Sequence, residues 1–225
     1  PVSNAQTTAE HTMTLMLNLQ RNTYQALSEV KNGNWQSRNT HQSDEVYGKT
    51  LGIVGFGNIG QKVATMASAF GMKVQYWSRS ILSSSYPYLP LDQLQETSDI
   101  LSIHVPLNPS TQCMIDHTFI AKCKKGVMFV NTARAQIFDR QALLDGLNSG
   151  YIGGYAADVP MSPYPTADDE LNLHPKTLIT AHVSSLTDHT FYQMCQMTVE
   201  NVIAILKGSP VDPKYIKNYN EVNFR

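Results

Sequence analysis

The sequence predicts an α/β fold with a doubly wound parallel sheet, and two observations lead to this prediction. Short apolar runs alternate with helical patterns through most of the 225 residues, which is typical of parallel strands joined by right-handed helical crossovers. In addition, the apolar run at residues 51–54 leads directly into a glycine motif and then into a helical pattern at residues 63–70. A strand, a tight turn and a helix in that order form the unit from which such sheets are built.

The elements before this unit are expected to be a helix and a loop. Thr7 and Glu10 have the spacing of a capping box, apolar residues then recur at helical intervals, and Asn32-Gly33 provides a stop signal. One long helix is therefore expected from Thr7 to that stop signal, and a polar loop over residues 36–45 should follow it.

After the glycine motif the alternation continues to a last long helix. The predicted strands span residues 51–54, 72–77, 100–105, 127–130, 155–159 and 177–180. The predicted helices after the motif span residues 63–70, 91–94, 118–123, 141–147 and 187–206. The segments 83–90 and 160–175 contain several prolines and are expected to be loops.

The motif Gly55-Phe56-Gly57-Asn58-Ile59-Gly60 has the G-x-G-x-x-G pattern of Rossmann dinucleotide sites. We interpret Gly55 as the residue of the tight turn, Gly57 as the place where the backbone approaches a pyrophosphate, and Gly60 as the contact between helix and strand. The backbone at Asn58 and Ile59 opens the helix and should bind the phosphates. A glycine-rich loop without a ligand is the alternative, and the strand and helix on either side disfavour it.

The residues after the second strand bear on the choice of cofactor. A domain that binds NAD usually has an acidic residue here, which binds the 2′-hydroxyl of the adenine ribose. Between residues 46 and 91 there is no Asp or Glu, and the strand ends in Ser78-Arg79-Ser80. An arginine between two hydroxyls suits a 2′-phosphate, so we expect NADP, with NAD as the alternative if Arg79 is only a solvated loop residue.

Charge and cysteine content exclude several classes of protein. The net charge of -1 gives no electrostatic ground for binding nucleic acid or a membrane surface. The three cysteines lack metal-ligand spacing, which indicates free thiols in a reducing compartment and no metal site. Because we also find no signal peptide and no apolar run long enough to span a bilayer, we expect a cytoplasmic protein.

Three polar residues lie at or just after the carboxyl ends of predicted strands, where an open α/β sheet binds its ligand. Arg134 can bind a substrate carboxylate with two parallel hydrogen bonds. His182 can exchange a proton with a hydroxyl or carbonyl oxygen near neutral pH. Asp158 can accept a hydrogen bond from a nicotinamide carboxamide. Each residue alone also fits a structural role, as a surface ion pair, a core histidine or a helix cap, and their convergence on one sheet edge favours a site.

With these motifs in place, the chain resembles the D-isomer-specific 2-hydroxyacid dehydrogenases, a family that includes glyoxylate/hydroxypyruvate reductases, D-lactate dehydrogenases and formate dehydrogenase. Besides the glycine motif, the matching stretches are Thr8-Ala9-Glu10-His11, His104-Val105-Pro106-Leu107 with Thr111, Val130-Asn131-Thr132-Ala133-Arg134, Gly154-Tyr155-Ala156-Ala157-Asp158-Val159 and Thr180-Ala181-His182. Together they cover nearly the whole chain, which makes the resemblance more specific than any single motif.

The resemblance implies a role for each matching residue. Arg134 would orient the substrate and His182 would be the acid/base. The residues that would line the cofactor are His104, Val105, Pro106, Thr111, Thr132, Ala133 and Asp158. A homodimer is implied as well, because relatives usually pair through this domain.

Three positions depart from the family pattern. The family usually has Gly and Pro where this chain has Ala135 and Ala181, which are small changes near the nicotinamide. A glutamate that raises the pKa of the histidine typically lies where this chain has Pro163, and the spacing from Asp158 to His182 matches without a gap. Formate dehydrogenase has Gln there, so catalysis is still expected.

Acidic residues further along the same loop could supply the missing carboxylate; these are Asp168, Asp169 and Glu170. Without such a partner the histidine should hold its proton less well, so we predict that activity falls at a lower pH than in a glutamate-bearing relative. A pH profile that stays flat through neutrality would count against this.

The resemblance also implies a division of the chain. Residues 1–33 would form a linking helix, residues 34–183 the dinucleotide-binding domain, and residues 184–225 a return helix and tail, through Tyr215, toward a flavodoxin-like substrate domain. Because that domain mostly precedes the first helix in the family, we expect most of it to be missing from this chain.

The function expected from these observations is hydride transfer between NAD(P)H and a small 2-oxo acid or D-2-hydroxy acid, as in glyoxylate or hydroxypyruvate reductases. One alternative is a dinucleotide-sensing binding protein that resembles the corepressor branch of the family, for which the Pro163 departure leaves room. Another is a formate-dehydrogenase-like enzyme, indicated by Gly154-Tyr155-Ala156 and the proline-rich loop, although Arg79 argues against its preference for NAD.

Overall fold

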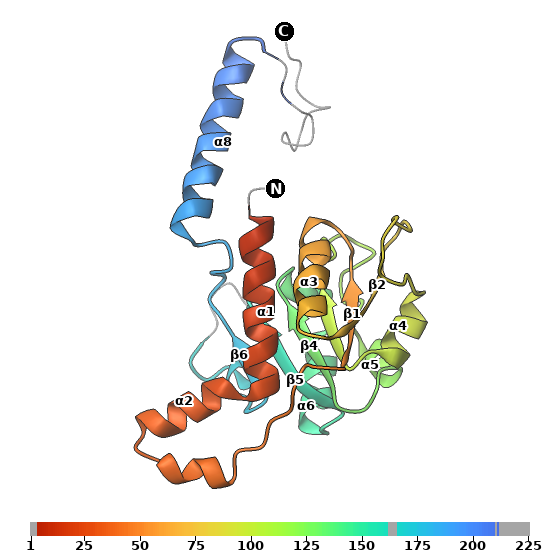
Figure 1. Cartoon of the computed structure of the whole chain (residues 1–225), viewed down its shortest axis with the longest axis vertical. Helices are drawn as coiled ribbons and strands as arrows, with labels where there is room; N and C mark the ends of the chain where they lie inside the picture. The colour runs from red at the N-terminus through yellow and green to blue at the C-terminus, as the bar shows by residue number, and fades with distance from the viewer. Residues whose placement is uncertain (1–3, 162–165, 210, 212–225) are drawn as a thin grey trace.

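A computed structural model describes residues 4–161, 166–209 and 211, and a six-stranded sheet forms its centre (Figure 1). The strands are β1 (Thr50–Val54), β2 (Lys73–Trp77), β3 (Ile100–Ile103), β4 (Val127–Asn131), β5 (Ile152–Ala157) and β6 (Thr177–Ile179). Their spatial order is β2-β1-β3-β4-β5-β6, and every neighbouring pair is parallel. The predicted doubly wound parallel sheet is confirmed, and its strand order reverses between β1 and β3.

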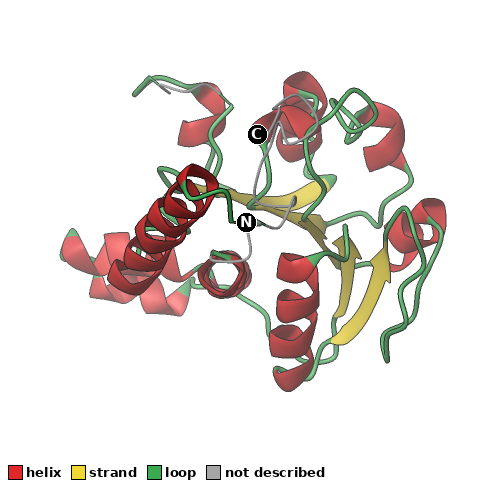
Figure 2. Cartoon of the chain, turned by 90° about the horizontal axis from the view of Figure 1, so that it is seen from above, coloured by secondary structure: helices red, strands yellow, loops and turns green. Residues whose placement is uncertain are grey.

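Helices cover both faces of the sheet (Figure 2). On one face lie α1 (Ala5–Arg21) and α3 (Asn58–Ala69), and on the other lie α4 (Leu91–Thr97), α5 (His117–Ala121) and α6 (Arg140–Asn148). The strand β1 serves both layers, because Leu51 and Ile53 pack in the cluster with α1 and α3, whereas Val54 packs in the other. Strands buried on both faces read as continuous apolar runs, which is why the sequence predicted them.

The N-terminal region differs from its prediction. Instead of one long helix, α1 is followed by α2 (Thr23–Lys31), and the break lies at Asn22, whose φ of 51° is left-handed. The predicted capping box is wrong, because the helix begins earlier, at Ala5, and the Thr7 hydroxyl donates to the Asn4 carbonyl at 3.2 Å. A short 3-10 helix, η1 (Trp35–Asn39), overlaps the start of the predicted loop that follows.

The C-terminal part agrees more closely with its prediction. The last long helix, α8 (Asp188–Leu206), is capped by Thr187, whose hydroxyl accepts a hydrogen bond from the Thr190 amide at 3.2 Å. This helix projects away from the sheet in Figure 1, and of its residues Thr190 alone is buried in the described part of the chain. Two short helices lie in segments predicted as loops or left unassigned, namely η2 (Ala135–Ile137) and α7 (Glu170–Leu173). The domain boundaries at residues 33 and 183 stay predictions.

Candidate functional site

The glycine turn after β1 is built by close contacts that only glycine permits. Gly55 has a φ of 101°, and a Cβ there would lie 2.7 Å from the carbonyl carbon of His104. A Cβ on Gly60 would lie 2.4 Å from the Gly55 carbonyl oxygen, so α3 can approach the turn this closely only without a side chain. At Gly57, by contrast, nothing lies within 4 Å of an added Cβ. The turn therefore leaves an open cradle at Gly57, directly before the first helical turn of α3.

This cradle has the chemistry of a phosphate site. The N–H groups of the first turn of a helix have no acceptor within the helix, and they carry the positive end of its dipole. In α3 the first turn contains Asn58, Ile59 and Gly60, and no side chain caps it. The open space at Gly57 and the free amides of a twelve-residue helix fit the pyrophosphate of a dinucleotide.

Three cavities lie along the carboxyl edge of the sheet, and we name each by its position. The central cavity, of about 520 Å³, adjoins the glycine turn and contains Gly57, Asn58, Ile59, Gly60, His104, Val105, Pro106, Thr132, Ala133, Arg134 and His182 in its wall. The β2-side cavity, of about 660 Å³, adjoins the end of β2 and includes Gly55, Ser78, Arg79, Ser80 and Thr111. The β6-side cavity, of about 630 Å³, includes Arg134, Gln136, Asn172, Thr180 and His182.

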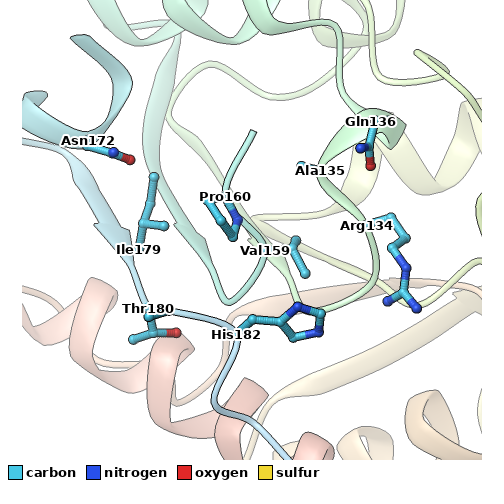
Figure 3. Close-up of a pocket in the computed structure, with 10 residues that line it drawn as sticks. Arg134, Ala135, Gln136, Val159, Pro160, Asn172, Ile179, Thr180 and His182 are labelled. Atoms are coloured by element: carbon cyan, nitrogen blue, oxygen red, sulfur yellow. The ribbon is translucent and has the colours of Figure 1, made fainter. Parts of the chain in front are cut away.

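The two residues predicted to be catalytic lie together. Arg134, after β4, and His182, after β6, both line the central cavity and the β6-side cavity. In Figure 3 the His182 ring extends toward the side on which the Arg134 guanidinium lies. The topology thus brings a guanidinium and an imidazole, 48 residues apart in sequence, to one wall beside the glycine turn.

Asn131 shapes the loop that carries Arg134. Its side-chain amide donates to the Arg134 carbonyl at 3.0 Å, and its side-chain oxygen accepts from the Ala133 amide at 3.0 Å. Asn131 is fully buried at the end of β4, so its two hydrogen bonds hold the backbone of this loop in one conformation. The Arg134 guanidinium itself is turned back, with Nη1 donating to the Ala133 carbonyl at 2.6 Å.

Asp158 shapes the loop that carries His182, and it lines none of the three cavities. Its carboxylate accepts from the backbone amides of Val183 and Ser184, each at 2.8 Å, and from the Thr180 hydroxyl at 2.6 Å. Burial raises the pKa of this carboxyl, but hydrogen bonds from His11, Thr180 and Ser184 outweigh it and hold the pKa well below its usual range. The expected contact of Asp158 with a cofactor carboxamide stays a prediction, whereas its contacts with the His182 loop are direct.

Two more residues that were predicted to line the cofactor, Thr111 and His104, form hydrogen bonds with other residues of the chain. The Thr111 hydroxyl donates to the Pro106 carbonyl at 2.7 Å and accepts from the Asn108 amide at 2.9 Å, so it braces the loop after β3 while it lines the β2-side cavity. The Nε2 of His104 lies 2.8 Å from the Ser102 hydroxyl, and burial lowers the pKa of His104 to about 3. His104 is therefore neutral at physiological pH.

The end of β2 presents an arginine with no acidic neighbour. Arg79 is exposed and lines the β2-side cavity between Ser78 and Ser80. No Asp or Glu lies among the described residues that line this cavity. The Ser78 hydroxyl donates to the Ser80 carbonyl, which closes a small turn around the arginine.

The acidic residues considered as substitutes for the family glutamate lie elsewhere. None of the three lines the central or the β6-side cavity. Asp169 caps α7 by accepting from the Asn172 amide, and it pairs with Arg140 at 3.0 Å. Pro163 itself lies outside the described residues, as does the tail at Tyr215.

Some residues at the site were not predicted from sequence. Asn4, Thr8, Ser184 and Ser185 also line the central cavity, and Gln136 and Asn172 contribute side chains to the β6-side cavity. The resemblance gave a signal for Thr8, which lies in a matching stretch, but none for the two amides. In the part of the chain that the structure describes, no group of three His, Cys, Asp or Glu residues is arranged to hold a metal ion. None of the described helices is both long and apolar enough to cross a membrane.

Comparison with known proteins gives consistent matches. Residues 13–184 match the family model described as D-isomer specific 2-hydroxyacid dehydrogenase, NAD binding domain. D-3-phosphoglycerate dehydrogenase of Bacillus subtilis is 36% identical over 216 residues, which is 94% of this chain and 41% of that protein. Glyoxylate reductase of Korarchaeum cryptofilum is 35% identical over 214 residues, which is 90% of this chain and 64% of that protein.

Solved structures agree with the sequence matches. The crystal structure of a glyoxylate reductase from Paecilomyes thermophila has a TM-score of 0.88 and is 32% identical, and the match covers 94% of this chain and 65% of that one. The chain therefore spans between about two fifths and two thirds of the length of these relatives.

Proposed function

This chain belongs to the D-isomer-specific 2-hydroxyacid dehydrogenase family, and from that premise we propose that it forms the cofactor-binding and catalytic part of an NAD(P)H-dependent reductase of small 2-oxo acids. The observation that carries the proposal is that Arg134 and His182 line one cavity with the glycine turn. A dinucleotide whose phosphates bind the α3 amides therefore has its other end beside a carboxylate-binding group and a proton donor.

The side chains divide the work as follows. A bound NAD(P)H supplies the hydride for the carbonyl carbon. Arg134 releases the Ala133 carbonyl, binds the substrate carboxylate with two parallel hydrogen bonds and fixes the orientation of the carbonyl group. His182, when protonated, donates its proton to the carbonyl oxygen as negative charge develops there. In the direction of oxidation, the neutral imidazole accepts the hydroxyl proton.

We further propose that the enzyme prefers NADPH. The support is Arg79 at the end of β2, between two hydroxyl side chains, in a described cavity wall without acidic groups. A guanidinium there compensates a 2′-phosphate, whereas the 2′-hydroxyl of NADH gains no carboxylate acceptor. Arg79→Ala should weaken NADPH binding by about tenfold or more and change NADH binding little, since a charge-assisted bidentate contact is worth more than about 1.4 kcal/mol.

The experiment follows the absorbance of the reduced nicotinamide while the purified protein and cofactor are incubated with glyoxylate, hydroxypyruvate, pyruvate or formate. Turnover of a 2-oxo acid that is lost in Arg134→Ala and His182→Ala supports the proposal. The exposed Arg38→Ala is the matched control and should keep full activity.

Other outcomes separate the alternatives. Reduction of NAD with formate as the only active acid would indicate a formate-dehydrogenase-like enzyme. Tight NADPH binding with no turnover of any of the acids would indicate a dinucleotide-sensing binding protein. The proposed homodimer is tested in the same preparation by sedimentation velocity, where a monomer at assay concentration would refute it.

A further inference from the structure

We propose that His11, on α1, is a positioning residue for the loop that carries His182, acting through a hydrogen-bonded chain that runs from His11 through Thr180 to Asp158. The effect on turnover rests on the proposed function, whereas the hydrogen-bonded chain can be tested without it. His11 lies in the first helix, 171 residues before His182 in sequence, and it lines none of the three cavities.

The geometry fixes the direction of each hydrogen bond. Thr180 Oγ1 lies 2.6 Å from Asp158 Oδ1 and 3.0 Å from His11 Nε2. An ionised carboxylate only accepts, so the Thr180 hydroxyl donates to Asp158, and its oxygen accepts from the N–H at His11 Nε2. The same Nε2 lies 3.5 Å from Asp158 Oδ1, which places the donor of α1 beside the buried negative charge.

The Asp158 carboxylate in turn fixes the backbone around His182. It accepts from the amides of Val183 and Ser184, the two residues after His182. His182 has a φ of 59°, a left-handed conformation that a non-glycine residue adopts only when its surroundings impose it. In the described part of the chain no hydrogen bond holds the His182 ring, so the direction of the imidazole depends on this backbone. A carboxylate that shifted would move the imidazole with it.

The helix α1 is a rigid support for this chain. One side of α1 packs in the core, where Met13 and Met16 are buried against the sheet. The neighbouring Thr12 contacts the loop that carries Arg134, because its Oγ1 lies 2.9 Å from Thr132 Oγ1. Within the helix the same hydroxyl donates to the Thr8 carbonyl at 2.7 Å. Thr132 precedes Arg134 by two residues. Successive residues of one helix therefore touch the loop of the arginine and the loop of the histidine.

The test compares two variants of His11 that differ in their ability to donate. His11→Leu replaces the imidazole with an apolar side chain of similar bulk and so removes the N–H, whereas His11→Gln introduces a side-chain amide that can donate to Thr180. We expect His11→Leu to lower kcat about tenfold and to change the KM for the nicotinamide cofactor by less than about twofold, because a displaced acid affects the chemical step more than binding. His11→Gln should restore most of kcat.

Amide hydrogen exchange of Val183 and Ser184 gives a readout that does not need turnover. Their exchange should accelerate in His11→Leu and stay near the wild-type rate in His11→Gln, because the amides bond to the carboxylate that His11 supports. Thr180→Val and Thr180→Ser form a second pair with the same expected contrast, and they decide the question if His11→Leu does not fold. His41→Leu, at an exposed histidine, is the matched control and should change neither quantity.

Two results would overturn the inference. One is wild-type kcat and wild-type exchange in His11→Leu. The other is an equal loss in the Leu and Gln variants of His11, which would show that the imidazole is needed for packing rather than for donation. If the wild-type protein turns over none of the acids, the proposed function fails, and a rise in Val183 and Ser184 exchange confined to the Leu variant still supports the positioning role.

Discussion

Acidification should destabilise the protein through His104, and the size of the effect follows from its surroundings. Burial lowers the pKa of His104 to about 3, from 6.5 in an unfolded chain. Between these two values the unfolded chain binds a proton that the folded protein does not. Stability attributable to this group is therefore full above the unfolded pKa and is lost as the pH falls below it.

The magnitude can be worked out for a change from about pH 7 to about pH 5. Each pH unit below the unfolded pKa removes about 1.4 kcal/mol per group, and about one and a half units lie in this interval, so the loss is about 2 kcal/mol. Urea unfolding at both pH values measures it. His104→Gln removes the titrating group and places another polar side chain near Ser102. The stability that this variant loses between the two pH values should therefore be about 2 kcal/mol smaller than the loss in wild type.

Among the other described groups, His174 also has a lowered pKa, caused mainly by burial, and it adds equally to the loss in wild type and in His104→Gln. The carboxyl groups with lowered pKa values act mainly below about pH 5, because their unfolded pKa values are near 4. The exposed His41→Gln serves as the control for removal of an imidazole. An equal loss of stability in wild type and His104→Gln would refute the reasoning and show that the His104 imidazole accepts a proton in the folded state.

The remaining predictions concern the glycine turn and the cysteines. Gly60→Ala should lower the free energy of unfolding by about 1–3 kcal/mol in urea, because its methyl group would lie 2.4 Å from the Gly55 carbonyl oxygen. Gly57→Ala should unfold like wild type yet bind NADPH at least about tenfold more weakly in a fluorescence titration, since its methyl group enters the open cradle; the opposite pattern in the two variants would contradict both expectations. With a thiol reagent at about pH 8, two cysteines should react in the native protein and Cys123 only after unfolding, because burial raises its pKa to about 12. Three reactive thiols in the native protein would show that Cys123 is accessible.

Most of the fold could be predicted because strands and turns leave local signals. All four residues of β3 are buried, and such a strand reads as an apolar run whatever its neighbours are. The break between α1 and α2 left only a weak signal, because Asn22 takes the left-handed position that Gly more commonly occupies at the end of a helix. The mistaken capping box has a similar origin, since Thr7 and Glu10 have the right spacing inside a helix that has already begun.

The main residues of the candidate site could be predicted from the sequence, but the hydrogen bonds that join them could not. Strand order and the glycine motif are enough to bring Arg134 and His182 to one edge of the sheet. The partners of Asp158 could not be read from the sequence, because they come from α1 and from the loop after β6. Such contacts depend on side-chain directions that only the packed structure fixes. For the same reason Asn172, which faces the β6-side cavity from a short helix, was not foreseen.

The packing of α1 has a consequence for biosynthesis. The contact of His11 with Thr180 spans 169 residues, so at about 5–20 residues per second the ribosome needs about 8–34 s to deliver the partner residue. Before then α1 can pack only on elements that are synthesised earlier, such as α3 and the strands that share its hydrophobic cluster. The hydrogen bonds from α1 to the loop after β6 therefore form last, and a nascent chain arrested before β6 would have a covered α1 but an incomplete candidate site.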